Sequence, residues 1–184
     1  ERITYNFKEG YFKWASREVH GNEFDNLKLL SIEGININVN DYQVNQGDKL
    51  KVKWYFNETK GKRSFIIKYL ATDGLITLDN NKNKIDWMAV GSEWQVPINR
   101  LRVAINLSQS VEKIEAVRQK EDITEKTKNN IIFTKGRLST GESYRITVKF
   151  PLIYSTDKNT SELDDTTAKN IGFSILAGIL IGLI

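Results

Sequence analysis

The sequence predicts an all-β fold, an antiparallel β-sandwich followed by a polar linker and the start of a C-terminal transmembrane helix. Apolar and polar residues alternate over several short runs, turn-forming residues separate these runs, and the final apolar segment carries no charge. The expected boundaries are residues 1–154 for the sandwich, 155–170 for the linker and 171–184 for the apolar segment.

The composition suits one folded domain and narrows the classes of function. A chain of 184 residues that is 40% hydrophobic can build a core. The 27 Lys and Arg residues are scattered and do not form a basic patch, so no nucleic-acid partner is expected. The chain has no cysteine and a single histidine, His20, which we expect to be an ordinary loop residue. Neither a disulfide, a metal site nor a cofactor is therefore predicted.

The first half of the chain contains the clearest strand patterns. Ile3, Tyr5 and Phe7 alternate with polar residues, and Glu9-Gly10 predicts a turn after them. Further β regions are expected over residues 27–32 and 35–39, and residues 57–62 are expected to form a loop. Residues 50–56 and 64–70 are therefore predicted to be antiparallel neighbours. The most regular alternation predicts a strand with two different faces. The apolar face is formed by Leu50, Val52, Trp54 and Phe56, and the solvent-exposed face by Lys49, Lys51, Lys53 and Tyr55.

The second half continues the same pattern around two tryptophans, Trp87 and Trp94. A polar turn follows residues 75–78, and an apolar run resumes at residues 86–90. The polar and charged composition of residues 119–130 predicts a loop or a short helical turn. Further strands are expected over residues 101–107, 111–117, 131–133 and 144–150.

Several of these segments resemble the extracytoplasmic domain of a family of predicted membrane proteins called domain of unknown function 2207. The matching segments are residues 1–7 with Arg17, 65–69, 86–94 with 96–98, and 138–151. The resemblance implies a signal segment and a strand before Glu1, and transmembrane helices and a cytoplasmic tail after the sandwich. Both ends of the sequence are then expected to be truncated. The resemblance implies no catalytic residues.

The apolar segment, residues 171–184, is expected to contact the lipid bilayer. It is shorter than the roughly 20 residues of a membrane-spanning helix, so the span is complete only if the chain continues. The alternatives are a buried helix or an apolar C-terminal strand. Gly178 and Gly182 have a spacing that lets membrane helices pack closely. The expected location is the cell membrane, with the β-domain on the extracytoplasmic side.

Candidate sites are few. Asp79, Asn81 and Asn83 have the spacing of the first ligands in a calcium loop, but Lys84 and Val90 replace its glycine and its glutamate, so a plain turn is favoured. Asp86 and Glu93 are the candidate acid and base of a glycan hydrolase. Trp87 and Trp94, and in addition Trp14, are candidate sugar platforms, although large aromatics in a sandwich are more often core.

Three segments match the glycosylation sequon: Asn57-Glu58-Thr59, Asn106-Leu107-Ser108 and Asn159-Thr160-Ser161. The first and third lie in expected loops. Asn57 and Asn159 are therefore the predicted glycosylation sites.

The leading functional hypothesis is a membrane-anchored extracytoplasmic interaction or structural module without catalytic activity of its own, whose partner is a membrane or envelope protein. The alternative is a cell-envelope glycan-binding module or glycan hydrolase that uses carboxylates near Trp87 and Trp94.

Overall fold

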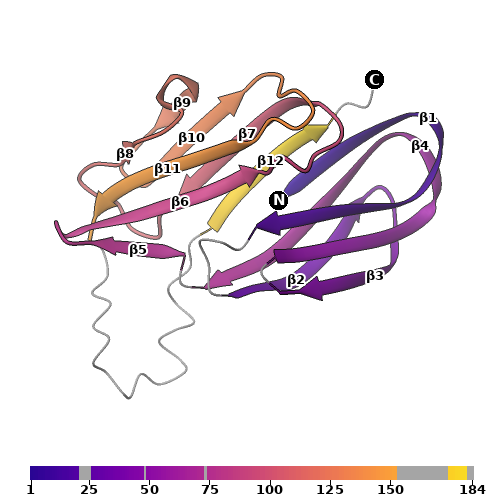
Figure 1. Cartoon of the computed structure of the whole chain (residues 1–184), viewed down its shortest axis with the longest axis horizontal. Helices are drawn as coiled ribbons and strands as arrows, with labels where there is room; N and C mark the ends of the chain where they lie inside the picture. Colours follow the sequence, from indigo (N-terminus) through magenta and orange to yellow (C-terminus); the bar gives the residue numbers. More distant parts are fainter. Residues whose placement is uncertain (21–25, 48, 73, 153–173, 182–184) are drawn as a thin grey trace, which may run out of the picture.

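The computed structural model describes residues 1–20, 26–47, 49–72, 74–152 and 174–181, which form two β-sheets (Figure 1). None of the helical structure in this described part is long and apolar enough to cross a membrane. The all-β prediction is confirmed. The elements are β1 (Arg2–His20), β2 (Asn26–Ile35), β3 (Val39–Gln46), β4 (Lys49–Thr72), β5 (Leu75–Leu78), β6 (Lys82–Val90), β7 (Ile98–Asn106), β8 (Glu115–Ala116), the 3-10 turn η1 (Lys120–Asp122), β9 (Ile123–Lys126), β10 (Asn130–Lys135), β11 (Tyr144–Pro151) and β12 (Ser174–Ile181).

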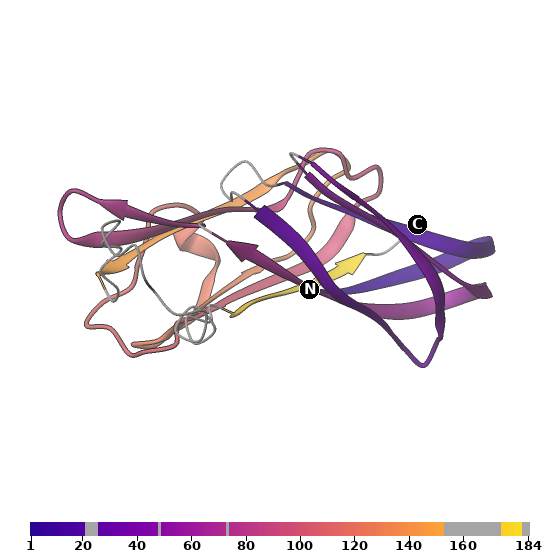
Figure 2. The ribbon, with the colours of Figure 1, turned by 90° about the horizontal axis from the view of Figure 1, so that it is seen from below.

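The two sheets face each other and enclose the core (Figure 2). One sheet has the strand order β2-β4-β1-β12-β7-β10-β9, with β3 paired to β4, and the other has the order β5-β6-β11-β8. Alternate residues of the strands point inward, and each fully buried large side chain contributes roughly 1.5–3 kcal/mol. The largest fully buried side chains include Trp54, Phe65, Trp87, Phe133, Tyr144 and Phe150.

The long strands β1 and β4 form a two-stranded ribbon that folds back on itself. Their antiparallel register runs from Ile3 opposite Phe65 to Val19 opposite Leu50. Both strands turn back at the same end of the molecule (Figures 1 and 2). The Trp54 ring consequently lies 5.3 Å from the Phe65 ring, although the two residues belong to the same strand.

The bend corrects two predictions. The expected turn at Glu9-Gly10 and the expected loop over residues 57–62 are both part of continuous strands. Residues 50–56 and 64–70 are therefore not paired neighbours; they belong to one strand whose two halves pack against each other. Gly61 has a positive φ of 80°, which allows β4 to bend at this residue. The register of β1 against β4 shifts between Phe7 and Trp14.

Most other predicted elements are found. The strands at 50–56, 75–78, 101–107, 131–133 and 144–150 are present, and residues 79–81 turn between β5 and β6. The run over 35–39 is not one strand, because Asn36 adopts a positive φ of 57° and separates β2 from β3. Only Glu115–Ala116 of the expected strand at 111–117 is a strand, while η1 and β9 lie within the polar region 119–130.

Ser174–Ile181, within the segment where the sequence predicts the start of a transmembrane helix, forms the strand β12. β12 is antiparallel to β7 and parallel to β1, with Gly178 opposite Arg102 on one side and Arg2 on the other. An uncharged run of this length has no period that distinguishes a strand from a helix, so the composition fits both. Residues 153–173, which include the expected linker, and residues 182–184 lie outside the described residues.

Candidate functional site

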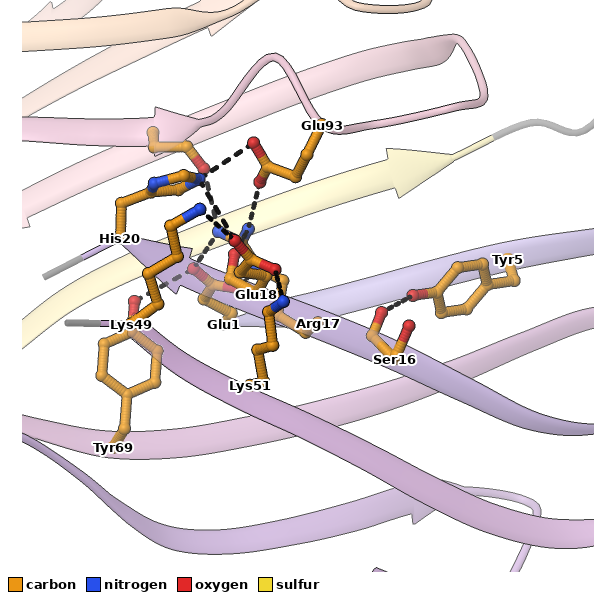
Figure 3. A network of polar contacts seen from close by, with 11 residues as sticks. Glu1, Tyr5, Ser16, Arg17, Glu18, His20, Lys49, Lys51, Tyr69 and Glu93 are labelled. Carbon is orange, nitrogen blue, oxygen red and sulfur yellow. Dashed lines mark hydrogen bonds and ion pairs between the residues drawn. The ribbon is translucent and has the colours of Figure 1, made fainter. Parts of the chain in front are cut away.

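A buried ion pair joins the start of β1 to its far end. The Arg17 guanidinium donates from Nε to Glu1 Oε2 at 2.7 Å and from Nη2 to Glu1 Oε1 at 2.9 Å, and both side chains are only 1% exposed (Figure 3). Arg17 also donates to the Ala89 carbonyl of β6, while the Tyr69 hydroxyl of β4 donates to Glu1. The pair therefore links three strands of the folded sandwich.

The surroundings keep this pair ionised. Burial by itself raises the pKa of the Glu1 carboxyl, but the charge and the hydrogen bonds of Arg17 outweigh burial, so the pKa is lowered. Burial opposes the charge on Arg17, yet the Glu1 carboxylate raises the pKa of the guanidinium. Burial and the neighbouring Glu1 raise the pKa of the Tyr69 hydroxyl. An enclosed pair that is ionised at neutral pH serves as a structural link.

A second, more exposed layer of charges lies around the buried pair (Figure 3). His20 Nε2 is 2.9 Å from a Glu93 carboxylate oxygen. Lys49 and Lys51 bind the two oxygens of Glu18 at 2.6 and 3.0 Å. His20, which the sequence analysis expects to be an isolated loop residue, thus ends β1 and contacts an acidic side chain.

Two of the three candidate tryptophans, Trp87 and Trp94, lie in different environments. Trp87 points into the core from β6 and is 1% exposed, so its ring has no face open to a ligand. Trp94 is half-buried and packs against the core. Its ring lies 5.6 Å from the Arg17 guanidinium carbon, which places Trp94 against the buried ion pair.

The two candidate carboxylates are engaged within the fold. Asp86 accepts hydrogen bonds from Arg145 Nε at 2.7 Å and from Thr147 at 2.9 Å, both on β11. Burial raises the pKa of Asp86, but these bonds outweigh it and lower the pKa. Asp86 alternates with the buried Trp87 along β6, so the two side chains lie on opposite faces of the strand. The Glu93 carboxylate contacts His20, as described above.

The remaining predicted positions are not brought together into a site. Asn57 is exposed in β4 and accepts a hydrogen bond from Asn40 at 2.9 Å, whereas Asn159 lies outside the described residues. Gly178 lies in β12, and Gly182 is outside the described part. Asn83 is fully buried in β6. Across the described ranges, no three His, Cys, Asp or Glu side chains gather where they could hold a metal ion.

The third candidate tryptophan, Trp14, lies in a cluster of side chains on the outer face of the bent ribbon, and the sequence alone does not indicate that these side chains meet. We call Trp14, Ser16, Gln43, Lys53 and Tyr55 the ribbon surface. Trp14 is 51% exposed, and the Lys53 ammonium lies 4.2 Å from its ring centroid and 5.3 Å from that of Tyr55. The wet face of residues 49–55 is visible in the sequence, but its pairing with Trp14 depends on the β1–β4 register.

Comparison with known proteins assigns the chain to a family. The family model described as "Predicted membrane protein (DUF2207) N-terminal domain" matches residues 1–150. No protein with a curated description matches. Among solved structures, chitinase ChiA74 from Bacillus thuringiensis aligns at 14% identity over 79% of this chain and 28% of the chitinase chain. Its TM-score of 0.28 is too low to establish a common fold.

Proposed function

The chain belongs to the DUF2207 family of predicted membrane proteins, and from this premise we propose that its β-sandwich is an extracytoplasmic interaction module without catalytic activity of its own. The ribbon surface carries this proposal. It presents an exposed indole ring beside an ammonium group on paired strands, where a ligand contacts a preformed surface.

The polar groups elsewhere support a role without chemistry. The carboxylates of Glu1, Asp86 and Glu93 each face a basic side chain of the fold. An acid or base catalyst needs a pKa close to the working pH, but those of Glu1 and Asp86 are lowered. Their partners thus hold these two groups as ions that stabilise the sandwich.

Attachment to the bilayer through residues 171–184 is the second part of the proposal. It rests on the uncharged composition of that segment and on the family. Insertion into lipid requires Ser174–Ile181 to leave its place between β1 and β7, because the same backbone groups cannot pair in the sheet and within a membrane helix. Detection of a glycan on Asn57, which is exposed, is the measurement that supports the extracytoplasmic side.

A site-specific photo-crosslinker tests the interaction module. A benzophenone amino acid is placed at position 14 in the full-length membrane protein, and the intact cell envelope is irradiated. The matched control carries it at position 42, because Tyr42 is 51% exposed, as Trp14 is, but lies on β3 opposite the inward-facing Trp54, on the other face of the sheet.

We expect a discrete adduct from position 14 and none from position 42. The absence of an adduct from position 14 contradicts the proposal. A hydrolytic activity on envelope glycans that Asp86→Asn abolishes without unfolding the protein contradicts the non-catalytic role.

A further inference from the structure

We infer that the ribbon surface binds a polysaccharide chain that carries negatively charged groups. This inference rests on the proposed function, because it names the ligand of the interaction module. It draws on the arrangement of the side chains, the half-exposed ring of Trp14 and the balance of charge.

The strand register gathers the five side chains on one face. Lys53 of β4 lies opposite Ser16 of β1 on one side and opposite Gln43 of β3 on the other, while Trp14 lies opposite Tyr55. Residues opposite each other in antiparallel strands point to the same face. The alternate residues, including the buried Val52 and Trp54, point into the core, so this face is the outer one.

The chemistry of the face matches a sugar ring. An exposed indole offers a flat apolar surface to the C–H face of a pyranose, and sugar hydroxyls then need polar partners around the ring edge. Ser16 supplies a hydroxyl there. The Tyr55 hydroxyl donates to Gln43 Oε1 at 3.1 Å, which fixes the Gln43 amide and leaves its N–H groups as donors. The neighbours of Trp14 are thus polar, unlike the apolar surroundings of a protein-binding hot spot.

A shallow hollow that Ser16, Gln43 and Lys53 help to line gives the ligand room. Its volume is about 480 Å³, within the range of small-ligand sites. The side chains and backbone that line it include Ser16, Gln43, Asn45, Lys51 and Lys53. The hollow therefore continues the ribbon surface along β1, β4 and β3.

The charge balance favours an anionic ligand. Lys49, Lys51 and Lys53 outnumber the two acidic residues on this face, Glu18 and Asp41. Glu18 binds Lys49 and Lys51. Within the described ranges no carboxylate lies within ion-pair distance of Lys53, whose ammonium contacts the two rings instead. A carboxylate or phosphate on a sugar stacked against Trp14 reaches this ammonium.

A second pair of an aromatic ring and an ammonium group, on β1 and β4, gives a polymeric ligand a second contact. The Lys60 ammonium lies 5.9 Å from the ring centroid of Tyr11, which is 65% exposed and precedes Trp14 by three residues on β1. Phe12 and Ala15, the neighbours of these two aromatics, pack against the core, while both rings are at least half exposed. Two such pairs along one strand offer successive contacts to an extended chain.

The test measures binding of the whole chain, kept in mild detergent, to immobilised hyaluronan, a polysaccharide with a carboxylate in each repeat. We expect Trp14→Ala to weaken the apparent Kd about tenfold or more, because the stacking surface is lost. Lys53→Gln is expected to weaken it several-fold and to reduce its dependence on salt. Tyr42→Ala, which removes an equally exposed ring from the opposite face, is expected to leave the Kd unchanged.

Other ligands separate the alternatives. Equal binding to dextran, a neutral polysaccharide, overturns the role assigned to Lys53. Binding to phosphatidylglycerol vesicles that Trp14→Ala abolishes, without binding to hyaluronan, overturns the inference in favour of a lipid surface. If the photo-crosslinker at position 14 forms an adduct with a protein, and hyaluronan does not bind, this inference is overturned but the proposed interaction module is not.

Discussion

Arg17 holds the carboxylate of Glu1 with two hydrogen bonds, of 2.7 and 2.9 Å, and water reaches neither side chain. Sixteen positions separate these residues in the sequence, and the fold of the β1–β4 ribbon brings them together. Removing one partner leaves an uncompensated buried charge. This is expected to lower the free energy of unfolding more than the loss of an exposed ion pair does.

Arg17→Met is therefore expected to lower the free energy of unfolding by about 3–5 kcal/mol. Urea denaturation followed by circular dichroism measures this loss. The matched control is Lys68→Met, because Lys68 pairs with Glu33 at the surface and its removal is expected to change little. If Glu1→Gln in the Arg17→Met background restores none of the loss, the uncompensated charge is not its cause.

Acid is expected to destabilise the domain through Glu1 and Asp86. The folded state lowers the pKa of both carboxyls below their ordinary values of 4.5 and 3.8. Their contribution is thus fully present above those values and is lost as the pH falls through the lower, folded pKa values. The free energy of unfolding, measured from pH 7 to pH 3, is expected to decline toward the acid end. Asp86→Asn is expected to flatten this decline, and an unchanged slope contradicts the assignment.

Truncation to alanine is expected to lower the free energy of unfolding far more at Trp87 than at Trp14. Trp87→Ala empties a fully buried site and is expected to lower the free energy of unfolding by about 3–5 kcal/mol. Trp14→Ala removes a half-exposed ring and is expected to change it by less than about 1 kcal/mol. Urea denaturation of both variants tests this. Similar losses in the two proteins indicate that Trp14 belongs to the core.

Gly61 is expected to resist substitution because of its backbone conformation. With φ at +80°, Gly61→Ala is expected to lower the free energy of unfolding by about 1–2 kcal/mol. Gly47→Ala is the control, since an added Cβ there meets no atom within 4 Å. Thermal unfolding compares the two. Equal melting temperatures show that the ribbon bends without a left-handed residue at position 61.

A disulfide reports whether β12 lies in the sheet. Ile175 is opposite Ile105 in the antiparallel register, and the chain has no cysteine of its own. Opposite antiparallel residues have Cα separations compatible with a disulfide, so Ile105→Cys with Ile175→Cys is expected to cross-link under mild oxidation. Mass spectrometry of the detergent-solubilised protein measures the yield. Cysteines at 105 and 176, one position out of register, are the control.

The same pair tests membrane attachment. Insertion of residues 171–184 into lipid removes Ile175 from Ile105, so the yield of the disulfide is expected to fall after reconstitution into vesicles. An undiminished yield, together with release of the protein by a carbonate wash, argues against anchoring by this segment.

The sequence predicted the parts of the fold that depend on local pattern. The alternation of Leu50, Val52 and Trp54 with lysines predicted a strand with one buried and one wet face, because successive side chains of a strand point to opposite sides. The pattern could not distinguish a loop from a bend at Gly61, since both accept the same residues. The uncharged C-terminal run favoured a membrane helix over a strand, although a run of this length has no diagnostic period.

The sequence by itself determined the all-β class, most of the strands and the resemblance to a membrane-protein family that the match over residues 1–150 confirms. Tertiary structure alone decided which side chains meet. The pairing of Arg17 with Glu1 and the placing of Lys53 between Trp14 and Tyr55 both depend on the register of β1 against β4. The alternation of apolar and polar residues limits the register to steps of two residues, and packing between distant segments selects among them.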